Sequence, residues 1–208
     1  WAGLSKETAH QLGTPISSLI AWTEYLKLKG LDLALINEMG KDVYRLEIIA
    51  ERFSKIGSVP EIKPVVWQEA VQESVAYLEK RISWKVKLVF DFPESSVMVQ
   101  LNKSLFSWVI ENLTKNAVDA MGGEGIITYS MGDKGRYCFL DISDTGKGVS
   151  TSKFNRIFQP GFTTKERGWG LGLSLAKRIV ENYHEGKIFV KQSEIGKGTT
   201  FRILLRKG

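Results

Sequence analysis

The stretch "LFSWVIENLTKNAVDAM", residues 105–121, has apolar residues at helical spacing and two asparagines, Asn112 and Asn116, four positions apart. Residues i and i+4 lie on the same face of a helix, so both amide side chains can address one point. Amide oxygens are hard ligands that suit a magnesium ion (Mg²⁺) sharing its shell with phosphate oxygens. Such amides are costly to bury without a partner, and pairs of this kind also serve as helix caps or structural networks. Alone, the pair is therefore only a weak sign of a magnesium and phosphate site.

The segments on either side of this helix predict a domain of mixed strands and helices. Apolar periodicity predicts further helices at residues 68–82 and 173–183. Alternating patterns predict strands at residues 86–92, 125–132, 135–144, 186–193 and 198–206. This order indicates a sheet covered on one face by helices, an α/β sandwich. Cys138, the single cysteine, falls in an apolar run and is expected to be a buried strand residue.

The segment "DISDTGKGV", residues 141–149, follows one of these predicted strands. Asp144 would lie at the end of the strand, and Gly146 and Gly148 would form a turn that lets a flat ligand approach the backbone. A carboxylate can accept a hydrogen bond from the exocyclic amine of adenine, which would favour ATP over GTP. An ordinary Asp-Gly turn is the alternative interpretation.

The segment "PGFTTKERGWGLGLSLAKRIV", residues 160–180, combines a long loop with glycines that lead into a helix. Free N–H groups at a helix N-terminus bind phosphate, and two cationic side chains of the loop could reach the β- and γ-phosphates. The spacing differs from the dinucleotide-binding fingerprint, and no strand immediately precedes it. A further glycine turn, "GKGTTF", enters the last predicted strand. The loop residues concerned are Lys165, Arg167, Gly168, Gly170 and Gly172.

The N-terminal part of the chain has a different pattern. Two segments of residues 1–57 repeat apolar positions at intervals of three and four, which predicts a helical hairpin that turns near Gly30, with Asp32 capping the second helix. Such a hairpin cannot bury its apolar stripe alone, so we expect a homodimer that forms a four-helix bundle. Packing against the second half of the chain is the alternative. Residues 58–63 predict a linker, and residues 64–208 the α/β domain.

The net charge of +6 is concentrated in a short part of the chain. Basic and acidic residues cancel over residues 1–60, whereas residues 147–178 hold seven basic side chains and one acidic one. A short basic, glycine-rich segment fits a few phosphates better than a duplex, so no nucleic-acid partner is expected. No apolar run is long enough to span a bilayer, and no signal peptide is evident. We therefore expect a cytoplasmic location and no membrane contact by this segment, which could also be the cytoplasmic portion of a membrane-anchored sensor.

The order of these motifs resembles that of the sensor histidine kinases over nearly the whole chain. In "AHQLGTP", residues 9–15, the resemblance implies that His10 is the phosphorylated histidine, on a helix that Pro15 should kink. It further implies an ATP lid at residues 159–172 and an ATP-binding domain of the kind shared with gyrase and heat-shock ATPases. The positions that match the family's nucleotide site, with Asn112 and Asn116 as the magnesium box, are Asn112, Lys115, Asn116, Asp144, Gly146, Gly148, Phe158, Lys165, Arg167, Gly168, Gly170, Leu171, Gly172 and Thr199.

The resemblance implies autophosphorylation of His10 by Mg²⁺-ATP, transfer to an aspartate of a response regulator receiver domain, and phosphatase activity on that regulator. The family usually has an acid after the histidine, where this chain has Gln11; Gln11 and Thr14 are expected to orient a water for dephosphorylation. Alternatives are a nucleotide-binding dimeric scaffold with weak or no kinase activity, a gyrase- or chaperone-type ATPase, and a serine kinase. His184 is expected to end a helix, with its charge suiting the helix dipole, and to have no catalytic role.

Overall fold

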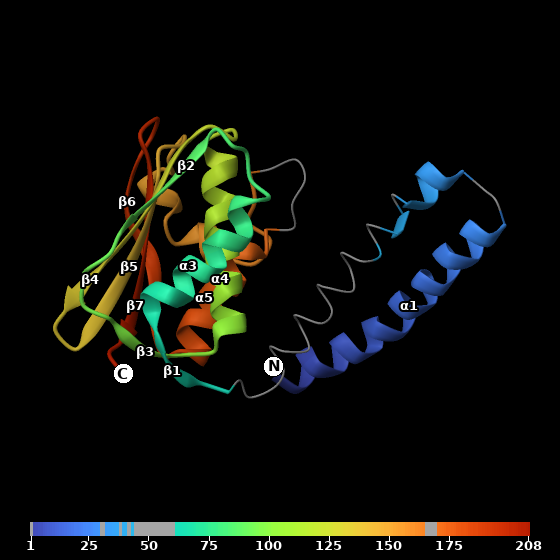
Figure 1. Ribbon diagram of the computed structural model, residues 1–208, viewed down its shortest axis with the longest axis horizontal. Coiled ribbons are helices and arrows are strands. Elements are labelled where there is room, and N and C mark those ends of the chain that lie inside the picture. The colour runs from blue at the N-terminus through green and yellow to red at the C-terminus, as the bar shows by residue number, and fades with distance from the viewer. Residues whose placement is uncertain (1, 30–31, 38, 41–42, 44–60, 165–169) are drawn as a thin grey trace. The chain divides into compact units, whose positions relative to one another are not determined.

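The computed structural model describes residues 2–29, 32–37, 39–40, 43, 61–164 and 170–208, and for residues 2–14 the backbone alone (Figure 1). The chain divides into two compact units, Trp1–Glu61 and Ile62–Gly208. Each unit is described by itself. None of the described helices is both long enough and apolar enough to cross a membrane.

The first unit contains helix α1 (Ala2–Leu28), which continues through Pro15, and helical residues at 33–37, 39–40 and 43. Asp32 caps the second helical segment as predicted, because its Oδ1 accepts hydrogen bonds from the N–H of Ala34 (2.9 Å) and of Leu35 (3.4 Å). Gly30, the predicted end of the first helix, lies outside the described residues. The two segments meet through Ile16 and Val43, which are buried.

The same helices also carry large apolar side chains that are exposed in the single chain. Burying such side chains is the main stabilising contribution to helix packing, so this surface is expected to require a partner. The exposed set comprises Leu19, Trp22, Tyr25, Leu28, Leu33, Leu35 and Met39.

The second unit is built on a five-stranded sheet with the order β2-β4-β5-β7-β6. Its strands are β2 (Val86–Asp91), β4 (Gly125–Lys134), β5 (Tyr137–Asp144), β6 (Lys187–Glu194) and β7 (Gly198–Arg206). Strands β2 and β4 are parallel, and the other neighbours are antiparallel. The sequence did not predict β1 (Lys63–Val66) and β3 (Met98–Leu101), which pair as a separate two-stranded sheet.

Helices α3 (Trp67–Glu79), α4 (Lys103–Ala120) and α5 (Gly172–Arg178) cover one face of the large sheet (Figure 1). Alternate strand residues, such as Tyr129, Leu140 and Ile203, are fully buried and form the core. Cys138 is buried on β5, as predicted. The α/β sandwich is therefore confirmed. The helix predicted at 173–183 is divided, because a π-helical turn, Ile179–Tyr183, follows α5.

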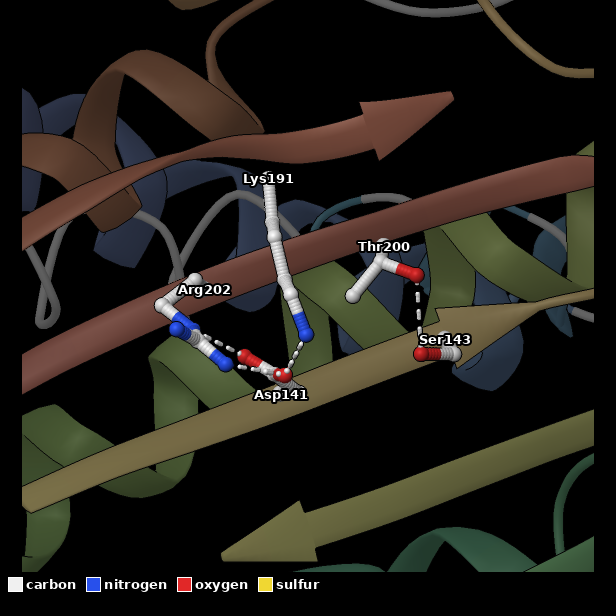
Figure 2. Close-up of polar contacts among 5 residues, drawn as sticks. All are labelled: Asp141, Ser143, Lys191, Thr200 and Arg202. Carbon is white, nitrogen blue, oxygen red and sulfur yellow. Dashed lines mark hydrogen bonds and ion pairs between the residues drawn. The ribbon is translucent and has the colours of Figure 1, made fainter. Parts of the chain in front are cut away.

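The opposite face of the sheet carries polar side chains (Figure 2). Asp141 on β5 accepts two hydrogen bonds from Arg202 (2.6 and 2.7 Å) and one from Lys191 (2.8 Å). Burial alone would raise the pKa of Asp141, but the hydrogen bonds from Arg202 and Lys191 outweigh burial and lower that pKa. This cluster joins β5, β6 and β7 on the side of the sheet away from the helices.

Candidate nucleotide site

Helix α4 is fixed at its start and at its centre. Asn102 caps it, since its Oδ1 accepts the N–H of Leu105 at 3.0 Å. Near the centre, the hydroxyl groups of Thr114 and Tyr129 form a buried hydrogen bond of 2.7 Å to the sheet, and burial raises the pKa of Tyr129 to about 12. Asn112 lies two residues before Thr114, and Asn116 lies two residues after it. The two asparagines therefore share a face of α4 that differs from the face of Thr114, and both are half-buried there.

His184 supports the start of the same helix. Its Nε2 accepts the backbone N–H of Asn102 at 3.0 Å, which fixes the neutral tautomer whose Nδ1 donates to the carbonyl oxygen of Ile179 at 2.9 Å. Burial lowers the pKa of His184, although the hydrogen bond to Ile179 opposes that shift. His184 does end a helical segment, but the expectation that it acts there as a charge is wrong. It is a neutral link between the element after α5 and the N-terminus of α4.

We expect the stability of the second unit to fall as the pH drops below about 6.5, because the unfolded chain binds a proton that neutral His184 does not. Protonation of Nε2 would leave the N–H of Asn102 without its acceptor, at a cost of about 1–3 kcal/mol. Urea unfolding at pH 7.5 and 5.5 measures this loss. His184→Gln should reduce the pH dependence, whereas His10→Ala should retain it. Equal pH dependence in His184→Gln and the unsubstituted chain would contradict the prediction.

The structure brings Asn112 into contact with the glycine segment that follows the lid. A Cβ atom at Gly172 would lie 3.0 Å from the Oδ1 of Asn112, so the absence of a side chain lets this backbone approach the amide. The Nδ2 of Asn112 is buried and, within the described structure, has no hydrogen-bond partner. A buried polar group without a partner is costly, and a phosphate oxygen would satisfy it. The other polar atom of the amide, Oδ1, is an oxygen of the kind that coordinates magnesium.

Asp144 lies at the end of β5 and is 8% exposed. Its Oδ1 accepts the N–H of Gly146 at 2.8 Å. Burial raises the pKa of this carboxyl, and the backbone donors of Gly146 and Thr199 partly oppose the shift. A Cβ atom at Gly198 would lie 1.9 Å from the backbone carbonyl oxygen of Asp144, so the first residue of β7 packs directly against the backbone of Asp144.

The loop after Asp144 is held between α4 and the β6–β7 turn. The N–H of Lys147 donates to the carbonyl oxygen of Ala120 at 3.0 Å, and a Cβ atom at Gly146 would clash with Ala120. Gly148 has a φ of +71°, and a Cβ atom there would lie 2.1 Å from the carbonyl oxygen of Glu194. Both glycines therefore form the tight turn that the sequence predicted.

The base of the lid is closed by backbone contacts. The N–H of Gly161 donates to the carbonyl oxygen of Gly170 at 3.1 Å, and Gly170 has a φ of +63°. Phe158, which precedes Gly161 in the chain, is buried and packs edge-on against Phe201, with ring centroids 6.1 Å apart. Leu171, which follows Gly170, is exposed. Three predicted site residues of the lid lie outside the described residues, as does Trp169: Lys165, Arg167 and Gly168.

Other predicted site residues differ in how far the structure describes them. Thr199 is buried beside Asp144 in the sheet register. Lys115 lies on α4 with an exposed side chain that forms an ion pair with Glu111 at 2.5 Å. His10, Gln11 and Thr14 lie within α1, but their side chains are outside the described part of the chain.

Ser193 supports the site and was missed by the sequence motifs. Its Oγ accepts the N–H of Val149 at 2.8 Å, donates to the carbonyl oxygen of Gly198 at 2.9 Å, and lies 2.9 Å from the hydroxyl of Thr199. It therefore links the Asp144 loop to the start of β7. A serine at the end of a strand has no motif of its own, and only the pairing of Ser193 with Thr199 reveals this position.

Comparison with known protein families identifies the family of the domain that contains the candidate site. Residues 102–208, just over half of the chain, match the model described as histidine kinase-, DNA gyrase B- and HSP90-like ATPase. The chain belongs to this ATPase family. The matched range contains α4, the Asp144 loop, the lid and β7, so the elements that surround the candidate site are those of the ATPase family.

The similarity to individual proteins extends to the first unit. The sensor histidine kinase ZraS of Escherichia coli (strain K12) is 28% identical over 209 residues, which cover 97% of this chain and 44% of ZraS. This chain thus spans less than half of that curated relative. The catalytic domain of histidine kinase ThkA has a TM-score of 0.64 at 27% identity and covers 71% of this chain and 96% of its own. ThkA in complex with the response regulator TrrA has a TM-score of 0.68 at 25% identity, covering 99% of this chain and 61% of its own.

Proposed function

We propose that this chain is the core of a sensor histidine kinase, in which the second unit binds ATP and His10 of the first unit receives the γ-phosphate. The observation that carries the proposal is that helix α4 meets both motifs, with the Gly172 backbone against Asn112 and the Asp144 loop against Ala120, in an ATPase-family domain that follows a helical unit with a histidine. Among the alternatives, a gyrase-type ATPase would not need His10.

The geometry supports specific roles for the site residues. Asp144 would accept the adenine amine, since its carboxylate is held at the end of β5 by the N–H of Gly146 and has acceptor capacity beyond that bond. Asn112 and Asn116 would hold magnesium, and the buried Nδ2 of Asn112 would donate to a phosphate oxygen. A bound magnesium ion would neutralise phosphate charge as the γ-phosphate leaves. Gly170 and Gly172 would allow the lid backbone to approach the phosphates.

The proposed partners are a second copy of the chain and a response regulator receiver domain. The exposed apolar side chains of the two helical segments, among them Trp22, Leu28 and Leu33, favour pairing into a four-helix bundle. The complex of ThkA with its response regulator supports a receiver domain as acceptor of the phosphoryl group. The proposed site of action is the cytoplasm, where ATP is available.

Incubation with γ-labelled ATP and Mg²⁺ tests the function. A histidine kinase yields protein-bound label that is stable to alkali and labile to acid, because the product is a phosphoramidate. Bound nucleotide without protein-bound label would favour the alternative of a nucleotide-binding dimeric scaffold with weak or no kinase activity. Acid-stable label would indicate a serine kinase, and phosphate release without label would indicate a simple ATPase.

Gln11, the residue after His10, is expected to affect the rate of autophosphorylation. A neutral imidazole attacks through its unprotonated nitrogen and must lose the N–H proton of the other nitrogen during or after attack, and Gln11 is a negligible base for that proton. We therefore predict that Gln11→Glu raises the initial autophosphorylation rate about tenfold or more. Rapid-quench measurement of labelled protein gives this rate, with ATP affinity as the control. An unchanged or lower rate would contradict a role for residue 11 in proton acceptance.

A further inference from the structure

The turn between α3 and β2 presents an indole ring to solvent. Trp84 is 89% exposed. The N–H of Val86 donates to the carbonyl oxygen of Ser83 at 3.0 Å, and the N–H of Lys85 donates to the hydroxyl of Ser83 at 3.3 Å. These bonds place Trp84 at the second position of a hydrogen-bonded turn. An ordered backbone therefore holds the ring outward, at a position that the nucleotide site does not use.

A second aromatic ring lies shortly before this turn on α3. Tyr77 is 56% exposed, and the guanidinium carbon of Arg81 lies 3.8 Å from the centroid of its ring. This stacking orients the cation and keeps it on the surface. With two exposed lysines that are close to them in the sequence, these exposed residues make up what we call the Trp84 patch: Tyr77, Lys80, Arg81, Trp84 and Lys87.

The Trp84 patch is positively charged. Residues 77–87 contain four basic side chains and one acidic side chain, Glu79. Lys85 forms an ion pair with Glu124 at 3.2 Å, which anchors the turn next to the start of β4. Within the described structure, Lys80, Arg81 and Lys87 form no ion pair, so their charge is available to an anionic partner.

We propose that the Trp84 patch binds peripherally to an anionic membrane surface. Indole and phenol rings favour the headgroup region of a bilayer, and unpaired lysine and arginine side chains are attracted to acidic lipids. The indole ring of Trp84 is at the tip of a turn. A protruding ring can insert into a membrane surface, whereas a small ligand requires a concave site. The sequence led us to expect no membrane contact because no segment spans a bilayer, but peripheral binding requires none.

Vesicle sedimentation with the whole chain tests this proposal. We expect binding to phosphatidylcholine vesicles with about 30 mol% phosphatidylglycerol, little binding to phosphatidylcholine alone, and loss of binding in about 0.5 M salt. Trp84→Ala and the double variant Lys80→Gln, Arg81→Gln should each lower the partition coefficient about tenfold. ATP affinity should not change in either variant, which also shows that both fold.

A matched control comes from the far end of β4. Lys134→Gln with Tyr137→Ala removes an exposed cation and a 37% exposed aromatic ring at the β4–β5 turn, and should leave vesicle binding unchanged. An equal loss in this control would overturn the proposal, since binding would then reflect net charge alone. Absence of vesicle binding would also overturn it, and capture by polyglutamate in that case would point to an acidic protein instead. Vesicle binding does not require phosphorylation, so its failure would leave the kinase proposal standing.

Discussion

Replacement of His10 by alanine is expected to reduce acid-labile labelling by γ-labelled ATP to background. A neutral imidazole nitrogen is nucleophilic near pH 7, and its phosphoryl derivative is the acid-labile product that this labelling detects. The sequence contains only two histidines. The second, His184, is buried, and both of its ring nitrogens are engaged with Asn102 and Ile179. The prediction is checked by rapid-quench labelling at saturating Mg²⁺-ATP.

ATP affinity separates this result from a failure to fold. His10 belongs to the first unit and the nucleotide site to the second, so calorimetric binding of ATP should be the same with and without His10. His184→Gln, which keeps a hydrogen-bonding side chain at the start of α4, should retain labelling. Acid-labile label that persists in His10→Ala would refute the assignment of the phosphorylated residue.

Long periodic segments of the second unit could be predicted from the sequence, because their patterns extend over several turns or strand residues. The helix predicted from "LFSWVIENLTKNAVDAM" matches α4, and all five strands of the large sheet were expected. Strands β1 and β3 were not, because each has four residues and alternation over so short a run gives no clear signal. Their pairing depends on contacts that form only in the folded chain.

Within the candidate site, the sequence identified motifs but not how they meet. Asn112 and Gly172 are 60 positions apart, and their contact depends on how α5 packs against α4. The role of Ser193 depends on strand register, and the neutral state of His184 depends on burial. A periodic pattern carries none of this information. The close approach of Gly198 to Asp144 likewise explains a glycine that the sequence showed only as part of a turn.

Asp144→Asn is expected to lower ATP affinity about 10- to 100-fold, because a hydrogen bond from the adenine amine to a charged acceptor contributes about 1.5–3 kcal/mol. It should also reduce discrimination against GTP. The same change should not lower stability at neutral pH. Burial raises the pKa of Asp144, so the free energy of unfolding falls as the pH rises toward that pKa and the buried carboxyl ionises. An asparagine amide does not ionise and therefore avoids this loss of stability. Calorimetry with ATP and GTP, together with urea unfolding, measures both effects.

Asp141 provides the matched control, three residues earlier on β5 and on the opposite face of the sheet (Figure 2). Asp141→Asn should leave ATP affinity unchanged but lower the free energy of unfolding at pH 7 by about 1–3 kcal/mol, because it removes the charged acceptor of Arg202 and Lys191. The pKa of Asp141 is lowered in the fold, so its stabilisation is present at neutral pH and is lost in acid as the carboxyl protonates. Two acids on one strand should thus give opposite results. Loss of ATP affinity in both variants would mean that Asp144 acts through the stability of the sheet and does not contact adenine.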